Sequence, residues 1–185
     1  MPVEIERKFL VASDTWRAAS VASERQRDGL IGEYDGSKVR VRCGETRATL
    51  AVKGPRLGAQ RMEFEYEIPP TDAEAMLGIL CGERRLEKTR HDVVHTGDLW
   101  RVDVYEGRLA GLVLAEIELS HEGQAFERPD WLGPEVTHDP RFGKRSLFRW
   151  SMNVDRPFVL AEFLAAGARA VGRGGSVHEA SPKIE

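Results

Sequence analysis

Charged and apolar residues alternate with period two along most of the first two-thirds of the chain. Successive side chains of a strand point to opposite faces of a sheet, so each alternating stretch predicts a β-strand with one charged and one apolar face. Turns that contain glycine separate several stretches, which favours antiparallel hairpins that close into a barrel. The predicted strands are residues 3–10, 37–43, 46–53, 60–68, 86–95, 98–106 and 112–120.

The charged faces of these strands are grouped by sign. They are acidic in the first, fourth and seventh stretches and basic in the second, third and fifth. A sheet face in water is the ordinary interpretation of alternation, but such a face usually mixes charges with Ser, Thr, Asn and Gln. The predicted helices also need an apolar surface on which to pack. We therefore favour a barrel with its apolar faces outward, beneath the helices, and its charged faces lining the interior.

A charged interior needs compensation, because burying unpaired charge costs free energy. Salt bridges between strands would neutralise part of it. The remainder suits a divalent cation such as Mg²⁺ or Mn²⁺ on the carboxylates and a small polyanion on the Lys and Arg side chains. Arginine binds phosphate oxygens in pairs, so a ligand with several phosphates fits this interior best.

Two helical segments are predicted in the first half of the chain. Residues 13–20 open with Ser and Asp, which favour helix starts. In residues 69–80, Thr71 and Glu74 stand in capping-box register ahead of an apolar helical face.

The C-terminal third predicts further helices and a tail. Residues 129–139 predict a short helix and a turn, and residues 156–170 predict the longest helix, with Pro157 in its first turn. The glycine-rich polar segment 172–185 predicts a disordered tail. Residues 1–171 are expected to form one domain.

Composition excludes several classes of protein. A chain of 185 residues suits a single domain with a sizeable core. Its formal net charge of -3 argues against non-specific binding to a nucleic-acid polymer, and no apolar run approaches the roughly 20 residues that span a bilayer. Cys43 and Cys81 have no metal-type spacing and predict buried thiols in a reducing cytoplasm. We expect a cytoplasmic protein with no nucleic-acid or membrane partner.

Several of the alternating stretches resemble a known family. "EIERKFL" at 4–10 is similar to the ExExK signature of the CYTH superfamily, the triphosphate tunnel metalloenzymes. The resemblance covers roughly residues 3–150 in the family's order and is closest to the small bacterial members that hydrolyse inorganic triphosphate. Its other motifs are "VRVR" at 39–42, "ATLAVKG" at 48–54, "EFEYEIP" at 63–69, "KTR" at 88–90, "WRVDVYEG" at 100–107, "LAEIEL" at 114–119 and "WLGPEVTHDPRF" at 131–142.

The resemblance implies an α+β fold, an eight-stranded antiparallel β-barrel (the triphosphate tunnel) with helices packed outside. It also implies metal-dependent hydrolysis of inorganic triphosphate to pyrophosphate and phosphate, with Mg²⁺ or Mn²⁺ as cofactor. The implied metal ligands are Glu4, Glu6, Asp103, Glu116 and Glu118. The implied phosphate-binding residues are Lys8, Arg40, Arg42, Lys53, Lys88 and Arg90. Glu63 and Glu65 would support the basic groups or bind a second metal, and the residues implied in catalysis are Lys88, Tyr34 and Asp103.

Some positions stay open. Where the family more often has small residues and Asn, this chain has "GKRSLFRW" at 143–150, so Lys144 would contact phosphate or face solvent, whereas Arg145 is expected in solvent. Lys38, Arg47 and Arg61 share the parity of the site residues and would lie inside the tunnel or at its mouth.

Alternative functions also remain. On the same scaffold the chain would be a class IV adenylyl cyclase or a nucleoside or thiamine triphosphatase, and in a different class it would be a non-catalytic sensor of polyphosphate or nucleotides. The number of metals, the general base and the formation of a homodimer are not decided by the sequence.

Overall fold

The computed structural model describes residues 3–153 and 156–171. The strands of the described part are β1 (Val3–Val11), β2 (Ser20–Tyr34), β3 (Ser37–Cys43), β4 (Ala48–Leu57), β5 (Gln60–Ile68), β6 (Arg85–His95), β7 (Asp98–Tyr105), β8 (Val113–Glu118) and β9 (Leu132–Glu135). The helices are α1 (Pro70–Met76), α2 (Lys144–Asn153) and α3 (Leu160–Val171), with the short helical turns η1 (Asp14–Ala19), η2 (Leu77–Cys81), η3 (Gly107–Leu109) and η4 (Pro140–Phe142).

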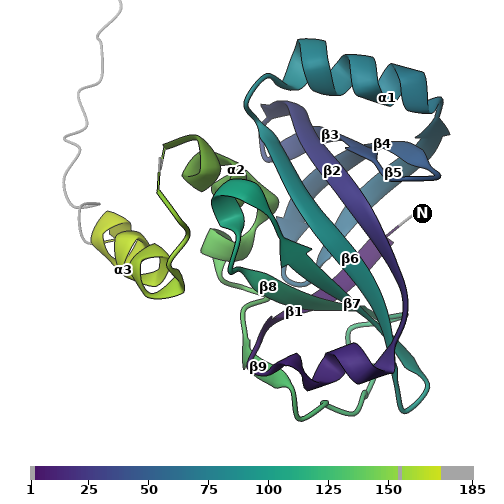
Figure 1. Ribbon diagram of the computed structural model, residues 1–185, viewed down its shortest axis with the longest axis vertical. Coiled ribbons are helices and arrows are strands. Elements are labelled where there is room, and N and C mark those ends of the chain that lie inside the picture. Colours follow the sequence, from purple (N-terminus) through teal and green to yellow (C-terminus); the bar gives the residue numbers. More distant parts are fainter. Residues whose placement is uncertain (1–2, 154–155, 172–185) are drawn as a thin grey trace, which may run out of the picture.

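Eight strands form a closed antiparallel ring. They follow the order β5-β4-β3-β2-β6-β7-β8-β1, and pairing of β1 with β5 closes the ring (Figure 1). This seam is short, since it joins only Val3, Ile5 and the residue between them to 60–62. The ninth strand, β9, pairs with the other side of β1. The ring confirms the predicted eight-stranded barrel.

All seven predicted strands are present, with ends shifted by a few residues, but the longest strand was missed. β2 runs for 15 residues and pairs with β3 and β6. Charged residues occupy both parities within it, as in Glu24-Arg25 and Arg27-Asp28, so its sequence shows no clean alternation. A register shift between Leu30 and Gly32 breaks the periodicity again.

Apolar side chains lie on the outer faces of the strands, as expected. α1 and η2 cover β3, β4 and β2, where Val41 and Cys43 are buried with Leu77 and Cys81. Glycine at position 29 permits this contact, because a Cβ atom there would lie 2.6 Å from the Cys81 sulfur. On another side of the ring, η1 lies on β6 (Figure 1).

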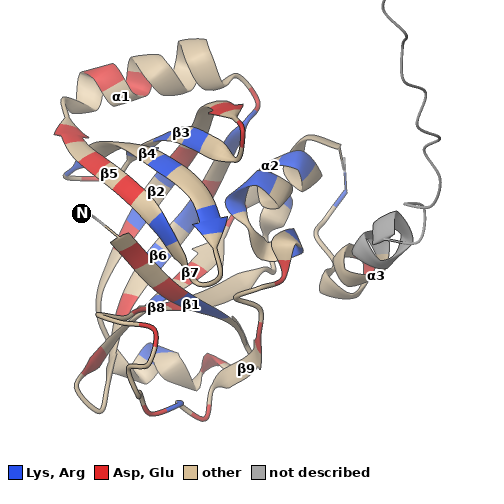
Figure 2. Ribbon diagram, turned by 180° about the vertical axis from the view of Figure 1, so that it is seen from behind, with Lys and Arg blue, Asp and Glu red and all other residues tan. Residues whose placement is uncertain are grey.

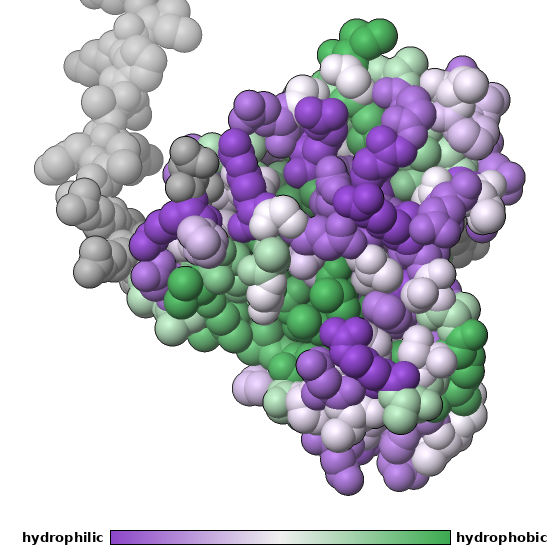
Figure 3. Space-filling view, viewed as in Figure 1, coloured by the Kyte–Doolittle hydropathy of each residue, from purple (hydrophilic) through white to green (hydrophobic). Residues whose placement is uncertain are grey.

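The interior carries the charges. Figure 2 shows basic residues along β3 and β4 and acidic residues along β5 and β1. The outer face in Figure 3 is largely hydrophilic, with an apolar area beside the C-terminal helices. Among the described residues, no helix has the length and apolar character needed to cross a bilayer.

Two predictions for the N-terminal half have clear outcomes. The capping box is wrong: α1 begins at Pro70 after Pro69, no side chain caps it, and Glu74 instead accepts hydrogen bonds from Arg27. Cys43 and Cys81 are buried free thiols, as predicted.

Three predictions for the C-terminal third need correction. Residues 129–139 contain strand β9 rather than a short helix, because this segment extends the sheet beside β1. α2 was not predicted, and α3 begins at Leu160, so Pro157 precedes the helix. The predicted tail, 172–185, lies outside the described residues.

Candidate active site

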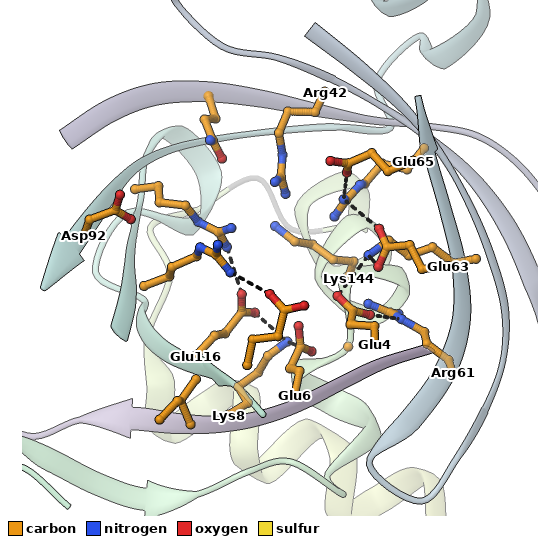
Figure 4. Close-up of a pocket in the computed structure, with 18 of the residues that line it drawn as sticks. Glu4, Glu6, Lys8, Arg42, Arg61, Glu63, Glu65, Asp92, Glu116 and Lys144 are labelled. Carbon is orange, nitrogen blue, oxygen red and sulfur yellow. Dashed lines mark hydrogen bonds and ion pairs between the residues drawn. The ribbon is translucent and has the colours of Figure 1, made fainter. Parts of the chain in front are cut away.

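The ring encloses a cavity of about 660 Å³ with a highly charged wall. Among the lining residues, eleven are Lys or Arg and eight are Asp or Glu, although the whole chain has a net charge of -3. Figure 4 shows these side chains pointing inward from strands around the ring, and Lys144 reaching in from a helix behind it. The wall therefore carries an excess of positive charge in a chain that is negative overall.

One pair of carboxylates meets at Lys8. The register of β1 and β8 places Lys8 directly opposite Glu116, and alternation on β1 puts Glu6 on the same face. The Lys8 Nζ lies 2.9 Å from Glu116 Oε1 and 3.5 Å from Glu6 Oε1. Arg90 Nη2 donates to the other oxygen of Glu116 at 2.8 Å. The carboxylates of Glu6 and Glu116, from neighbouring strands, thus face one position, which the ammonium group of Lys8 occupies.

A second pair of carboxylates meets at Lys53. Its Nζ lies 2.5 Å from Glu63 Oε2 and 3.3 Å from Glu4 Oε1, and Arg61 donates to the other oxygen of Glu4. Burial alone would raise the pKa of Glu4, but Lys53 and Arg61 outweigh it and lower that pKa. Burial, together with the charge of Glu4, raises the pKa of Glu63. The two carboxylates therefore have different affinities for a proton.

Beneath the wall, Asp103 is completely buried and binds two cations. Arg90 donates to both of its oxygens, Nε to Oδ1 at 2.6 Å and Nη2 to Oδ2 at 2.8 Å, and Lys88 also donates to it. Burial would raise the pKa of Asp103, but Arg90 and Lys88 lower it. Arg90 also contacts Glu116. The buried cluster of Asp103, Lys88 and Arg90 therefore holds the side chain of Glu116 in place on the cavity wall.

Two basic side chains of β3, Arg40 and Lys38, have the weakest pairing with carboxylates. Arg40 is 6% exposed, its Nε is buried without a partner, and the nearest carboxylate oxygens lie 3.8 Å away on Glu65 and 4.0 Å away on Glu63. Within the described residues, Lys38 has no carboxylate oxygen within 4.0 Å of its nitrogen. Burial and the neighbouring cations, chiefly Arg61, lower the pKa of Lys38 to about 7. Neither of these two cations has a carboxylate of the described residues at hydrogen-bonding distance.

Replacing Lys38 with Met should stabilise the ligand-free protein, most strongly below pH 7. The pKa of Lys38 is about 7 in the folded chain and 10.5 in the unfolded chain, so the charged form destabilises the fold. We expect a gain of about 1–3 kcal/mol below pH 7 that shrinks as the pH rises towards 10.5, where the group is neutral in both states. Denaturant unfolding at several pH values measures it.

The control for this experiment is Lys38→Arg. This variant keeps the charge at every pH and should show no gain in the free energy of unfolding. Equal stability of the Met variant and the natural protein at pH 6 would contradict the description of Lys38 as an uncompensated cation.

The carboxylate pairs fit a hard divalent cation. In the described part of the chain, no group of three Asp, Glu, His or Cys side chains converges on one point. Mg²⁺ is commonly held by one or two carboxylates, with phosphate oxygens and water completing its octahedron. The donors at Glu6 with Glu116, and at Glu4 with Glu63, suit that manner of binding.

Comparison with known proteins identifies the family. The CYTH domain matches residues 2–146. The chain belongs to the CYTH family. CYTH triphosphatases are metal-dependent, in keeping with the two pairs of carboxylates.

The chain is similar to proteins named inorganic triphosphatase over most of its length. It is 40% identical to an inorganic triphosphatase of Acetivibrio thermocellus over 149 residues, which cover 80% of this chain and 95% of that protein. It is 38% identical to an inorganic triphosphatase of Nitrosomonas europaea over 148 residues, covering 78% and 95%. The crystal structure of an inorganic triphosphatase superposes with a TM-score of 0.61 at 32% identity, covering 85% of this chain and 99% of the other.

Most of the predicted site residues lie on the wall of the CYTH cavity. They are Glu4, Glu6, Lys8, Arg40, Arg42, Lys53, Glu63, Glu65, Arg90, Glu116 and Glu118. Glu118 lies at the exposed rim, where its side chain is 57% exposed and accepts from Arg101 at 3.0 Å. Lys88 and Asp103 are buried behind the wall. They lie at the end of β6 and β7 over which α2 and the turns around η3 pack.

Tyr34 lies away from the cavity, contrary to the prediction. It is 87% exposed at the end of β2. Residues directly opposite each other on paired strands share a face of the sheet. Tyr34 is opposite Ser37 of β3, whereas the residues of β3 that face the cavity are Lys38 and its alternate neighbours. Tyr34 therefore faces outward. The register shift after Leu30 reverses the facing of the last residues of β2. We therefore give Tyr34 no role in the site.

Among the residues of the site that the sequence did not assign, Asp28 and Lys144 form a buried ion pair at the cavity wall. Asp28, in the unpredicted strand β2, is completely buried and binds Arg42, Nε to Oδ1 at 2.8 Å. Lys144, left open in the sequence, reaches Asp28 from α2, with Nζ 2.7 Å from Oδ2. Alternation of Glu24, Gln26 and Asp28 is the signal that would have placed Asp28 inside.

The remaining basic residues divide between the cavity and its rim. Lys38 and Arg61 are largely buried in the wall, whereas the side chain of Arg47 is 59% exposed and paired with Glu67. Arg145 is 52% exposed and paired with Glu33, as expected for a solvent-facing residue.

Proposed function

We propose that this chain hydrolyses inorganic triphosphate to pyrophosphate and phosphate in the charged cavity, with Mg²⁺ or Mn²⁺ as cofactor. The observation that carries the proposal is the excess of cations on the wall, including Lys38 and Arg40, which lack close carboxylates. Neutralising such a wall takes a small ligand with several negative charges. Similarity to inorganic triphosphatases at 38–40% identity supports the same substrate.

The cations of the wall would bind and align the phosphates. Phosphoryl transfer depends mainly on positioning and charge neutralisation. In this proposal Arg40, Arg42 and Arg90 donate to phosphate oxygens in pairs, and Lys8 and Lys53 add single contacts. Lys88 and Asp103 lie behind Arg90 and position its guanidinium rather than touching the substrate.

The carboxylate pairs would hold the metal. Glu6 and Glu116, from adjacent strands, form the first proposed site, with Glu118 at its rim; Glu4 and Glu63 form a second. When bound, the metal neutralises charge on phosphate oxygens and acts as a Lewis acid. Lys8 and Lys53 now contact the same carboxylates and would turn towards phosphate.

Water is the proposed nucleophile. Where only the first metal site is filled, Glu63 is free to accept its proton. Burial and the charge of Glu4 raise the pKa of Glu63, which brings it closer to the pH at which a general base works best. Glu65, on the same face of β5, would orient Arg40.

A substrate panel tests the proposal. We expect phosphate release from tripolyphosphate to exceed release from ATP, GTP, thiamine triphosphate and pyrophosphate by about tenfold or more. We also expect a chelator to abolish it and added Mg²⁺ or Mn²⁺ to restore it. Formation of cyclic AMP from ATP would instead favour an adenylyl cyclase, and tight binding without turnover would favour a sensor.

The proposed partner is therefore a small polyanion. The two buried free thiols suit a reducing compartment, and we propose a cytoplasmic location on that ground.

A further inference from the structure

Asp28 holds two cations from different parts of the chain. Its carboxylate is completely buried; Arg42 of β3 donates to one oxygen at 2.8 Å, and Lys144 of α2 donates to the other at 2.7 Å. Burial alone would raise the pKa of Asp28, but Arg42 and Lys144 lower it well below its usual value, so the group stays ionised. One negative charge thus faces two positive ones.

Both cations keep donors for a further ligand. An ammonium has three N–H donors and a guanidinium has five. Lys144 uses one donor on Asp28 and lies 5.1 Å from the centre of the Tyr105 ring, while Arg42 uses only Nε and Nη2 on Asp28. Lys144 and Arg42 both line the cavity, and Figure 4 shows both pointing into it.

A second observation indicates an anion at the same place. Arg40 is the inward neighbour of Arg42 on β3, and its buried Nε has no partner. The charge of Asp28 also acts on Arg40. Asp28 therefore binds two cations directly and acts on Arg40 at longer range, while Arg40 keeps an unused buried donor.

We propose that Lys144, Arg42 and Arg40 form a phosphate-binding subsite at the end of the cavity covered by α2, with Asp28 as the residue that positions Lys144 and Arg42. This inference rests on the proposed function and adds a ligand from α2 to the basic residues of the strands. Behind Lys144, the buried Leu147 and Phe148 of α2 close this end of the ring. The group that fits is the terminal phosphate of the ligand, because α2 blocks this end of the cavity and the row of phosphates cannot continue past it.

The alternative is that the Asp28–Lys144 pair only attaches α2 to the barrel. α2 has other attachments: Leu147 and Phe148 pack in the apolar core, and Arg145 and Arg149 both pair with Glu33 at 3.0 Å and 3.5 Å. A buried ion pair is in general weak evidence for a stabilising role. Anchoring alone also gives no account of the unused donors.

The test is binding of inorganic tripolyphosphate by titration calorimetry, with a chelator present so that no hydrolysis occurs. Lys144→Met should weaken binding by about tenfold or more, since a charge-assisted hydrogen bond is lost. Lys144→Arg should retain most of the affinity. The matched control Arg145→Met, from the exposed face of the same helix, should bind within about twofold of the natural protein.

A second variant keeps the test decisive where Lys144→Met unfolds the chain. Asp28→Asn with Lys144→Met removes both members of the pair, which is better tolerated than removing one. The loss of affinity should persist in this double variant.

Two results separate this subsite from the proposed function. Normal tripolyphosphate affinity in folded Lys144→Met or in the double variant would overturn the subsite and leave the proposed function intact. Failure of the natural protein to bind tripolyphosphate, with or without Mg²⁺, would instead overturn the proposed function and the subsite with it.

Discussion

Replacing Glu116 with Gln should reduce metal-dependent release of phosphate from tripolyphosphate by about 100-fold or more while leaving the fold intact. Glu116 is buried in the cavity wall, and its two oxygens contact Lys8 and Arg90. An amide has nearly the same shape but carries no charge, so it is a poor ligand for a hard cation. Initial rates over a range of Mg²⁺ and Mn²⁺ concentrations measure the effect.

The matched control is Glu67→Gln. Glu67 is 68% exposed on β5 and pairs with Arg47 outside the buried wall, so its loss should leave the rate nearly unchanged. Partial recovery of the Glu116→Gln variant at high metal concentration would support weakened metal binding. Undiminished phosphate release by that variant would show that Glu116 is not a metal ligand.

The largest effect on stability is expected at Asp103. Replacing it with Ala would leave Lys88, which is also completely buried, without its carboxylate, and Arg90 with only Glu116. Removing one partner of a buried pair costs about 3–5 kcal/mol. Denaturant unfolding of Asp103→Ala should show a loss of this size.

The pH dependence of this loss has a defined sign. Because Arg90 and Lys88 lower the pKa of Asp103 in the folded protein, its contribution is complete above its ordinary value of 3.8 and disappears only as the pH falls below it. Burial and Arg90 hold the pKa of Lys88 well below its ordinary value, and loss of Asp103 removes the charge that opposes them. The difference between the natural protein and Asp103→Ala should therefore be complete at pH 5 and shrink as the pH rises and Lys88 of the variant loses its proton.

Two variants test the explanation for Asp103. Asp14→Ala, which removes an exposed ion pair with Arg17, should change stability by less than about 0.5 kcal/mol. Lys88→Met with Asp103→Leu removes both buried partners and should recover a large part of the loss. A loss below 1 kcal/mol in Asp103→Ala would contradict the role of this cluster.

The sequence predicts the barrel and much of its wall because alternation is a local signal. Whether Glu4 and Glu6 face inward depends only on their parity on one strand, and the same holds for Arg40 and Arg42. The resemblance to the CYTH family supplies the number of strands, which the alternation alone does not.

The missing parts of the site depend on non-local geometry. Asp28 lies in a strand whose charges occupy both parities, and Tyr34 follows a register shift that no residue pattern announces. Lys144 enters the cavity only because α2 packs over one end of the ring, which depends on apolar contacts between distant segments. Lys88 and Asp103 have the predicted parity, but packing around them closes their access to the cavity.

The short seam of the ring has a consequence for how the protein folds. β1, the most N-terminal of the described strands, pairs with β8 and β9, whose residues follow it by more than 100 positions, and with only three residues of β5. Contacts this distant in sequence generally make folding slow. Because Glu4, Glu6 and Lys8 all lie on β1, the charged cavity is completed only when this first strand is inserted. A nascent chain that ends before β8 would carry an open sheet with an unpaired edge and no assembled site.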